Sequence, residues 1–227
     1  MSTKDKEVGA QEFEELLSAC TELAESFPEG VIFIGGIAVY LHCINREQTC
    51  EYAEFTHDAD FYISLADMAD LRDIEEVTPN RRLQKHQLIK RGFEFDIYTE
   101  RHSSLIVPYD QVLAHSHVYG NLRVACLEHL LVLKLEAYRD RHSSAKGRKD
   151  AKDVIRIGLA GENAGLNIRK LGTLNPELCV GYLSEEHLRH LSDIAKGPEF
   201  MSLARGNAKL AKGLRDRFAK VTRSIMG

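Results

Sequence analysis

The stretch 56-THDADFYIS-64 begins as a polar turn and continues as an apolar run that is typical of a strand entering a core. Asp58 and Asp60 lie at the start of this predicted strand, with Ala59 between them. Residues i and i+2 of a strand point to the same face, so the two carboxylates project together and repel each other at neutral pH. A cation bound between them would remove that repulsion. The alternative is a pair of solvated aspartates at the end of a strand.

A third carboxylate lies in a later segment. In 93-FEFDIYT-99 apolar residues alternate with polar ones, and this period of two predicts a strand with one face in the core. If this strand is a neighbour of the first, Asp96 converges with Asp58 and Asp60. Mg²⁺ prefers hard oxygen ligands, usually one or two carboxylates together with substrate phosphates. We therefore predict a magnesium site formed by these three aspartates.

A pair of glycines, Gly35-Gly36, follows the apolar segment 31–34 and precedes 37-IAVYLHCI-44. We expect a short buried strand, a tight turn and a helix of about two turns. Backbone N–H groups at such a junction can approach a phosphate at the positive end of the helix dipole. The chain contains neither GxxxxGK[ST] nor GxGxxG, so the turn is not a Walker loop or a dinucleotide fingerprint.

The remaining pattern divides the chain into an α+β half, about 1–125, and a helical half, about 126–227. In the first half we predict helices at 10–27 and 66–76 and a hairpin that turns at Tyr119-Gly120-Asn121. In the second half the predicted helices are 127–141, 148–159, 184–196 and 199–225. The predicted fold class is α+β, with a small mixed β-sheet and flanking helices, followed by a helical C-terminal half.

Composition indicates a soluble globular protein, since 44% of the 227 residues are hydrophobic and 28% are charged. No apolar run approaches the roughly 20 residues of a membrane helix. The N-terminus has no apolar segment of the kind found in signal peptides. Five cysteines, an odd number without a CxxC pair, predict reduced thiols that are mostly packed as small hydrophobes. We expect a cytoplasmic protein with no membrane partner.

The helical half contains a lysine in an apolar setting. In 127-LEHLLVLKLEAYRDR-141, Lys134 lies on the helix face of Leu127, Leu130 and Leu131. A lysine there needs an anion nearby or a route to water. One interpretation is a contact with an anionic ligand. The alternative is an aliphatic stem that extends to the surface.

The order of the strand, glycine turn and acidic strands resembles that of the polymerase-beta superfamily of nucleotidyltransferases. Its motifs run hG[GS], then [DE]h[DE]h, then h[DE]h, and here they correspond to FIGGIAVYL, HDADFYI and FEFDIYT within residues 30–100. One departure is the separation of 21 residues between Gly36 and Asp58, which is longer than in the compact family pattern. An insertion at 45–56 must therefore loop out.

The resemblance implies a set of roles for these residues. Asp58 and Asp60 would bridge two Mg²⁺ ions that hold a nucleoside triphosphate. Its phosphates would rest on Gly35 and Gly36. Asp96, at the second metal, would help to deprotonate an acceptor hydroxyl for in-line attack on the α-phosphorus.

A second pattern, K-x6-R-x7-KD-x2-D, begins at Lys134. It resembles the third and fourth motifs of the abortive-infection type E toxins and related nucleotidyltransferases of bacterial toxin–antitoxin systems. The resemblance implies that Lys134 and Lys149 contact phosphates, that Asp150 is an acid/base or organises the site, and that Asp153 orients a partner. It also implies a cognate antitoxin. The alternative is that Asp150 and Asp153 are acids of a first helical turn that complement the helix dipole.

Charge is distributed unevenly along the chain. The first thirty residues are acidic and the last thirty are basic. The predicted helix 199–225 carries an apolar stripe (Leu203, Leu210, Leu214, Phe218, Val221 and Ile225) and a basic stripe (Arg205, Lys209, Lys212, Lys220 and Arg223). The basic stripe could bind RNA phosphates, or it could be an ordinary solvated exterior.

We therefore expect a metal-dependent nucleotidyltransferase that moves a nucleoside monophosphate from a nucleoside triphosphate to an acceptor hydroxyl, with a nucleotide site that the helical half completes. The resemblance to the abortive-infection type E toxins implies a toxin role. The acceptor suggested by the resemblance is an RNA 3′ end, such as that of tRNA, or a protein. Two alternatives stay open: a catalytically inactive binding module with the same fold, and a small-molecule nucleotidyltransferase of the aminoglycoside type.

Overall fold

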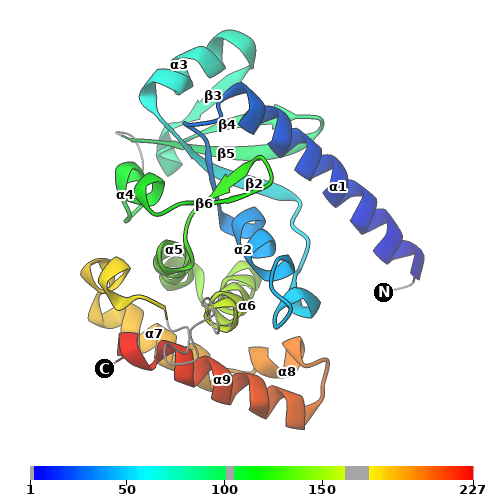
Figure 1. The fold of residues 1–227 in the computed structure, drawn as a ribbon, viewed down its shortest axis with the longest axis vertical. Coiled ribbons are helices and arrows are strands. Elements are labelled where there is room, and N and C mark those ends of the chain that lie inside the picture. Colours follow the sequence, from blue (N-terminus) through cyan, green and yellow to red (C-terminus); the bar gives the residue numbers. More distant parts are fainter. Residues whose placement is uncertain (1–2, 101–104, 162–173, 227) are drawn as a thin grey trace. The chain divides into compact units, whose positions relative to one another are not determined.

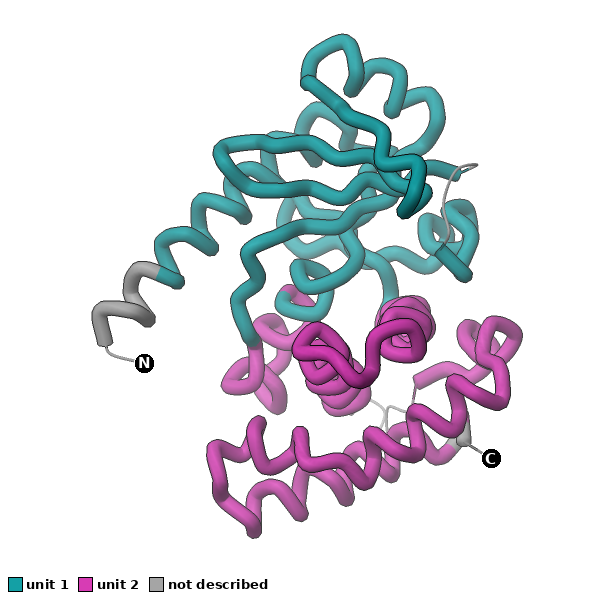
Figure 2. Tube along the Cα trace, turned by 180° about the vertical axis from the view of Figure 1, so that it is seen from behind, with its two compact units in different colours: residues 1–40, 54–126 teal, residues 41–53, 127–227 magenta. Residues whose placement is uncertain are grey.

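The computed structural model of the chain describes residues 3–100, 105–161 and 174–226. Two compact units are distinguished, one formed by residues 1–40 and 54–126 and the other by 41–53 and 127–227 (Figure 2). The fold class expected from the sequence is confirmed, because a mixed sheet with flanking helices precedes a helical C-terminal half (Figure 1). The division into an α+β half, 1–125, and a helical half, 126–227, stays a prediction.

The described residues of the first unit form a seven-stranded sheet of order β3-β4-β5-β2-β1-β7-β6. Its strands are β1 (Ile32–Ile34), β2 (Asp58–Ile63), β3 (Val77–Asn80), β4 (Lys85–Lys90), β5 (Phe93–Thr99), β6 (His117–Tyr119) and β7 (Leu122–Val124). Its helices are α1 (Thr3–Ser26), α3 (Leu65–Ile74) and α4 (Tyr109–Ala114), together with the start of α2 (Gly35–Ile44). The pairs β2–β5 and β1–β7 are parallel and the others are antiparallel.

Local sequence explains these elements. The predicted alternation of β5 is confirmed, since Phe95, Ile97 and Thr99 are buried while the residues between them are not. The hairpin β4–β5 turns at Arg91 and Gly92, both with positive φ, 52° and 84°, as a tight two-residue turn requires. The apolar residues expected on one face of the first helix form that face in α1, which packs against β2 and β7.

The second unit is helical. Its helices are α5 (Leu127–Arg141), α6 (Ala145–Ala160), α7 (Glu185–Lys196), α8 (Glu199–Leu203) and α9 (Ala208–Met226), together with the end of α2. The helices α5 and α6 pack against each other, and α9 packs against α6, α7 and α8. Gly158 allows α6 and α9 to pack closely, because a Cβ at Gly158 would lie 2.5 Å from the ring of Phe218 in α9.

The prediction of one helix over 199–225 is wrong. The helix is interrupted after Leu203, and Arg205 and Gly206 adopt positive φ values of 49° and 82°. Leu210, expected in the apolar stripe, is 39% exposed, and Ala211 is buried instead. The short elements β3 and α4 were not predicted, because neither has enough residues to show a period.

The cysteine prediction fits the structure. Four of the five free thiols are buried and Cys50 is exposed. Burial raises the pKa of the Cys43 thiol to about 12. Among the helices that the structure describes, none is both long enough and apolar enough to cross a bilayer.

Candidate active site

The three sequence motifs of the first unit meet at one place in the sheet. The strands β2 and β5 are parallel neighbours, and Asp60 is directly opposite Asp96. On the other side of β2, the antiparallel strand β1 places Ile34 opposite Asp60. Gly35 follows Ile34 and begins α2. The glycine turn and two of the three predicted aspartates therefore lie in one lateral row across three strands.

Gly35 is in direct contact with Asp60. Its φ is +64°, and a Cβ at this position would lie 2.1 Å from the Asp60 Oδ2 atom. Only glycine combines this backbone conformation with so close an approach of a carboxylate. The start of α2 and the carboxylate thus share one small space, and the first turn of a helix presents N–H groups without intrahelical partners there.

Thr56 links the second glycine to the first aspartate. A Cβ at Gly36 would lie 2.9 Å from the Thr56 hydroxyl oxygen, so the threonine packs closely over the turn. The Thr56 hydroxyl donates a hydrogen bond of 2.7 Å to Asp58 Oδ1. Asp58 itself is exposed and Asp60 is half-buried, so both carboxylates are accessible to a ligand. Sequence reasoning did not identify Thr56, although its position two residues before Asp58 was visible.

Asp96 is held by two side chains of strand β4. Lys85 Nζ forms an ion pair with Asp96 Oδ2, and Gln87 Nε2 donates to Asp96 Oδ1 over 3.2 Å. Gln87 is opposite Asp96 in the sheet. Asn80 Nδ2 donates to Gln87 Oε1 over 3.3 Å, which orients that amide toward the carboxylate. Lys85 was not predicted from the sequence, because only the pairing of β4 with β5 brings it to the site.

The donor atoms suit magnesium in part. Within the described ranges of the chain, no three His, Cys, Asp or Glu side chains lie close enough together to hold a metal ion. Asp58 and Asp60 supply the one or two carboxylates that Mg²⁺ usually takes from a protein, with phosphate oxygens completing its shell. The pair therefore fits such an ion. Asp96 could join it only after leaving its ion pair with Lys85.

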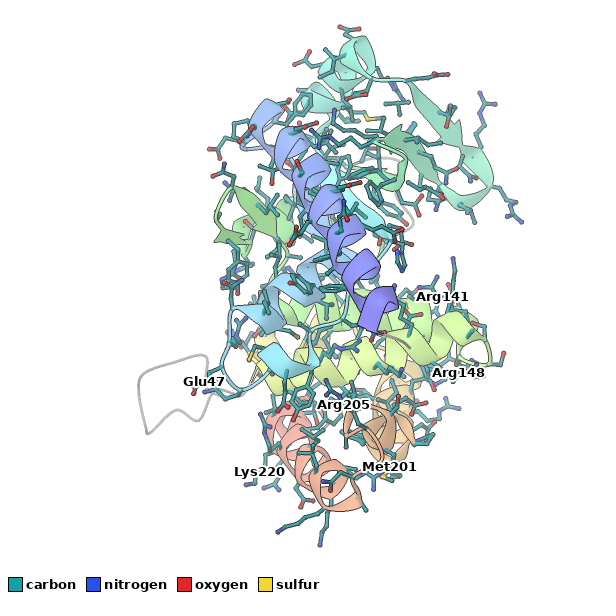
Figure 3. All side chains as sticks on the ribbon, turned by 90° about the vertical axis from the view of Figure 1, so that its right-hand side faces the viewer. Glu47, Arg141, Arg148, Met201, Arg205 and Lys220 are labelled. Atoms are coloured by element: carbon teal, nitrogen blue, oxygen red, sulfur yellow. The ribbon has the colours of Figure 1, made fainter. Side chains whose placement is uncertain are left out.

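In the second unit, the predicted residues Lys134 and Asp150 belong to a buried ionic cluster. Lys134 Nζ lies 2.7 Å from Asp153 Oδ2 and 3.5 Å from Asp150 Oδ1. Arg141 binds both oxygens of Asp150, at 2.7 and 3.0 Å. Arg156 lies 2.9 Å from Asp153 Oδ1. Figure 3 shows Arg141 near the end of α5, close to the turn that leads into α6.

The electrostatics of this cluster favour ionised carboxylates. Burial alone would raise the pKa of Asp153, but the positive charges of Lys134 and Arg156 outweigh it and hold that pKa below its ordinary value. The alternative that Asp150 and Asp153 are first-turn acids is wrong. Helix α6 begins at Ala145, capped by Ser144, so both acids lie further along the helix. Lys149, also on α6, is half-buried.

Comparisons with known proteins identify the fold. No family model matches the sequence, and no curated protein matches it. The structure is similar to that of the Megavirus polyadenylate synthase, with 11% identity, a TM-score of 0.50, and coverage of 98% of this chain and 54% of that one. It is also similar to an antigenic nucleotidyltransferase-like protein from Paracoccidioides brasiliensis, with 15% identity, a TM-score of 0.48, and coverage of 87% and 94%.

The chain therefore shares the fold of the Megavirus polyadenylate synthase. At 11% identity this likeness shows the fold alone. The resemblance of its motifs to the nucleotidyltransferase superfamily and the narrower resemblance to the abortive-infection type E toxins stay predictions.

The contact between Gly35 and Asp60 can be measured through stability. Gly35→Ala should lower the free energy of unfolding by more than Gly120→Ala, which has a similar φ of +59° but nothing within 4 Å of the added methyl. Both variants lose about 1–2 kcal/mol because an alanine adopts a positive φ. Any further loss of unfolding free energy in Gly35→Ala reports the clash with the Asp60 carboxylate. In an Asp60→Ala background this further loss should disappear. Urea unfolding of the four variants checks this, and equal losses at Gly35 and Gly120 would contradict it.

Removing Lys134 should destabilise the protein in a pH-dependent way. Lys134→Met leaves buried carboxylates without one of their cations, which costs about 3–5 kcal/mol at neutral pH. In the wild type, the depressed pKa of Asp153 contributes stability above the unfolded-state pKa, and this is lost as pH falls through the folded-state pKa.

In Lys134→Met one of the cations near Asp153 is gone, so burial raises the pKa of that carboxyl group. The loss of unfolding free energy should therefore shrink as the pH falls from neutral toward about 5. Urea unfolding at both pH values checks this. The exposed Lys146→Met on α6 serves as the control, and a loss independent of pH would contradict the prediction.

Proposed function

We propose that the protein is a metal-dependent nucleotidyltransferase, which joins a nucleoside monophosphate from a nucleoside triphosphate to an acceptor hydroxyl and releases pyrophosphate. The observation that carries the proposal is the lateral row of Ile34, Asp60 and Asp96 across β1, β2 and β5, with Gly35 directly after Ile34 and in contact with Asp60. Three motifs separated along the chain meet there: a glycine pair at a helix start, two carboxylates suited to a metal ion, and a further acid.

The residues of the row have separable tasks in this reaction. The turn at Gly35 and Gly36 offers backbone N–H groups and the positive end of α2 to the triphosphate. Asp58 and Asp60 would hold Mg²⁺, for which two ions are proposed, and the metal would supply charge neutralisation on the transferring phosphoryl group and on the pyrophosphate. Asp96 accepts the proton of the acceptor hydroxyl once its carboxylate is released from Lys85. Catalysis here is mainly positioning and charge compensation.

Phosphate contacts of Lys134 and Lys149 stay a prediction from the sequence. Within the helical unit, Asp150 is better suited to organising its ionic cluster than to proton transfer. The reason is that Arg141 binds both oxygens of Asp150, and Lys134 lies beside it. A toxin role, a cognate antitoxin and a cytoplasmic location stay predictions from the sequence.

Removal of Asp58 and Asp60 should abolish activity without lowering stability. Asp58→Ala/Asp60→Ala should lower transfer by about a thousandfold or more, because the metal supplies several kcal/mol of transition-state stabilisation. Its thermal midpoint should equal or exceed that of the wild type, since two repelling charges are removed. The assay is incorporation from each α-labelled nucleoside triphosphate with Mg²⁺ and total RNA.

The matched control is Asp70→Ala/Asp73→Ala, two exposed acids of α3 with the same charge change. A double variant at 58 and 60 that melts well below wild type would make the pair structural and overturn the proposal. Label on no acceptor would favour an inactive binding module. Label only on a small aminoglycoside-type substrate would favour that alternative.

We propose RNA as the acceptor because charge is divided between the two units. The first unit holds 10 of the 30 Lys and Arg residues and 20 of the 34 Asp and Glu residues, a net charge of −10. The second unit therefore has a net charge of +6. Exposed basic residues lie on α9, namely Lys209, Lys212, Lys220 and Arg223, and Arg205 is exposed in the turn before it. Arg205 and Lys220 are labelled in Figure 3. The similar Megavirus protein is named as a polyadenylate synthase.

Neutralising part of this basic stripe should weaken RNA binding in a salt-dependent way. Lys209→Gln/Lys212→Gln should raise the Kd for single-stranded RNA several-fold at low salt. The slope of log K against log salt should fall in magnitude by about 1.4, because two phosphate contacts are lost. Fluorescence anisotropy at several salt concentrations checks both values. The control is Arg81→Gln/Arg82→Gln, an exposed pair of the first unit, and equal weakening by the control would contradict the proposal.

A further inference from the structure

Lys85 brings a positive charge into a group of carboxylates. Asp58 is opposite Glu94 and Asp60 is opposite Asp96. The paired strands β2 and β5 therefore present four acids on one face of the sheet. The Lys85 ammonium forms its ion pair with Asp96, and the side chains of the two residues are only 11% and 20% exposed. Shielding from water strengthens such a pair relative to a surface ion pair.

The partners of Asp96 leave little room for another cation. Lys85 engages Oδ2 and Gln87 engages Oδ1, so both oxygens of the carboxylate are occupied by donors from β4. A divalent ion that binds Asp96 has to displace at least the ammonium, because two cations on one carboxylate oxygen repel each other strongly at short distance. The Gln87 amide is neutral and does not compete in this way.

We propose that Lys85 is a positioning residue that competes with a divalent cation for Asp96. Its ammonium keeps the affinity of Asp96 for the second ion low until a triphosphate draws the flexible lysine stem away. The inference rests on the proposed function, because it assumes the metal site of Asp58 and Asp60. It assigns a residue that the sequence motifs do not include.

The test measures binding of Mn²⁺, by electron paramagnetic resonance of the free ion, without any turnover. Lys85→Met should bind an additional Mn²⁺ ion, or bind the Asp96-dependent ion about tenfold more tightly or better. Lys85→Gln, which keeps a hydrogen-bond donor but not the charge, should give the same gain. A non-hydrolysable nucleoside triphosphate should reduce the difference in Mn²⁺ affinity between these variants and the wild type.

Two controls isolate the ion pair. Lys90→Met removes a lysine of the same strand that pairs with Glu75 and Glu22, and it should leave Mn²⁺ binding unchanged. In an Asp96→Asn background, Lys85→Met should give no gain. Three outcomes would each overturn the inference. The first is Mn²⁺ binding by Lys85→Met and Lys85→Gln that equals that of the wild type. The others are a gain in Mn²⁺ affinity that persists without Asp96, or an equal gain in Lys90→Met.

Failure of the proposed function has a different signature. In that case the wild type would show no Mn²⁺ binding that depends on Asp58 and Asp60, even with the triphosphate analogue present. If that binding is present and Lys85→Met leaves it unchanged, only the role of Lys85 is wrong.

Discussion

The lateral register of β1, β2 and β5 is the constraint on which the candidate site depends. Phe33, Phe61 and Ile97 are directly opposite one another in the three strands, and all three are fully buried. A slip of one residue would turn this apolar row out of the core, so packing fixes the register strongly. The next row along the strands contains Asp60 and Asp96, on the other face of the sheet. The core residues therefore position the carboxylates, although they do not touch them.

Sequence reasoning predicted the parts of this arrangement that depend on local pattern. The period of two in β5, the helical period of α1 and the glycine pair that begins α2 are each visible within about ten residues. The break between α8 and α9 was missed, because the helical period continues through Arg205 and Gly206 while the backbone there turns. Lys85 was missed for a different reason. Its role follows from strand pairing between β4 and β5, which no local pattern specifies.

The two groups of aspartates show how one residue type serves different purposes. In the second unit, Asp153 is buried and is compensated by Lys134 and Arg156, so the protein itself supplies the opposite charge. In the first unit, Asp58 is exposed, accepts a hydrogen bond from the neutral Thr56, and belongs to a unit with an excess of acids. Internal compensation favours a structural or organising role, whereas accessible acids in an acidic unit favour an external cation. The distinction requires burial and partners, which the spacing of acids along a chain does not contain.

The ion pair at Asp96 gives the proposed reaction an order. While the Lys85 ammonium is paired with Asp96 Oδ2, that oxygen is occupied and is not open to an acceptor hydroxyl. If the arriving triphosphate draws Lys85 away, the base becomes available only when its substrate is bound, and the positive charge moves to where negative charge is transferred. The pair β4–β5 then does more than extend the sheet. It couples the third acid to the substrate.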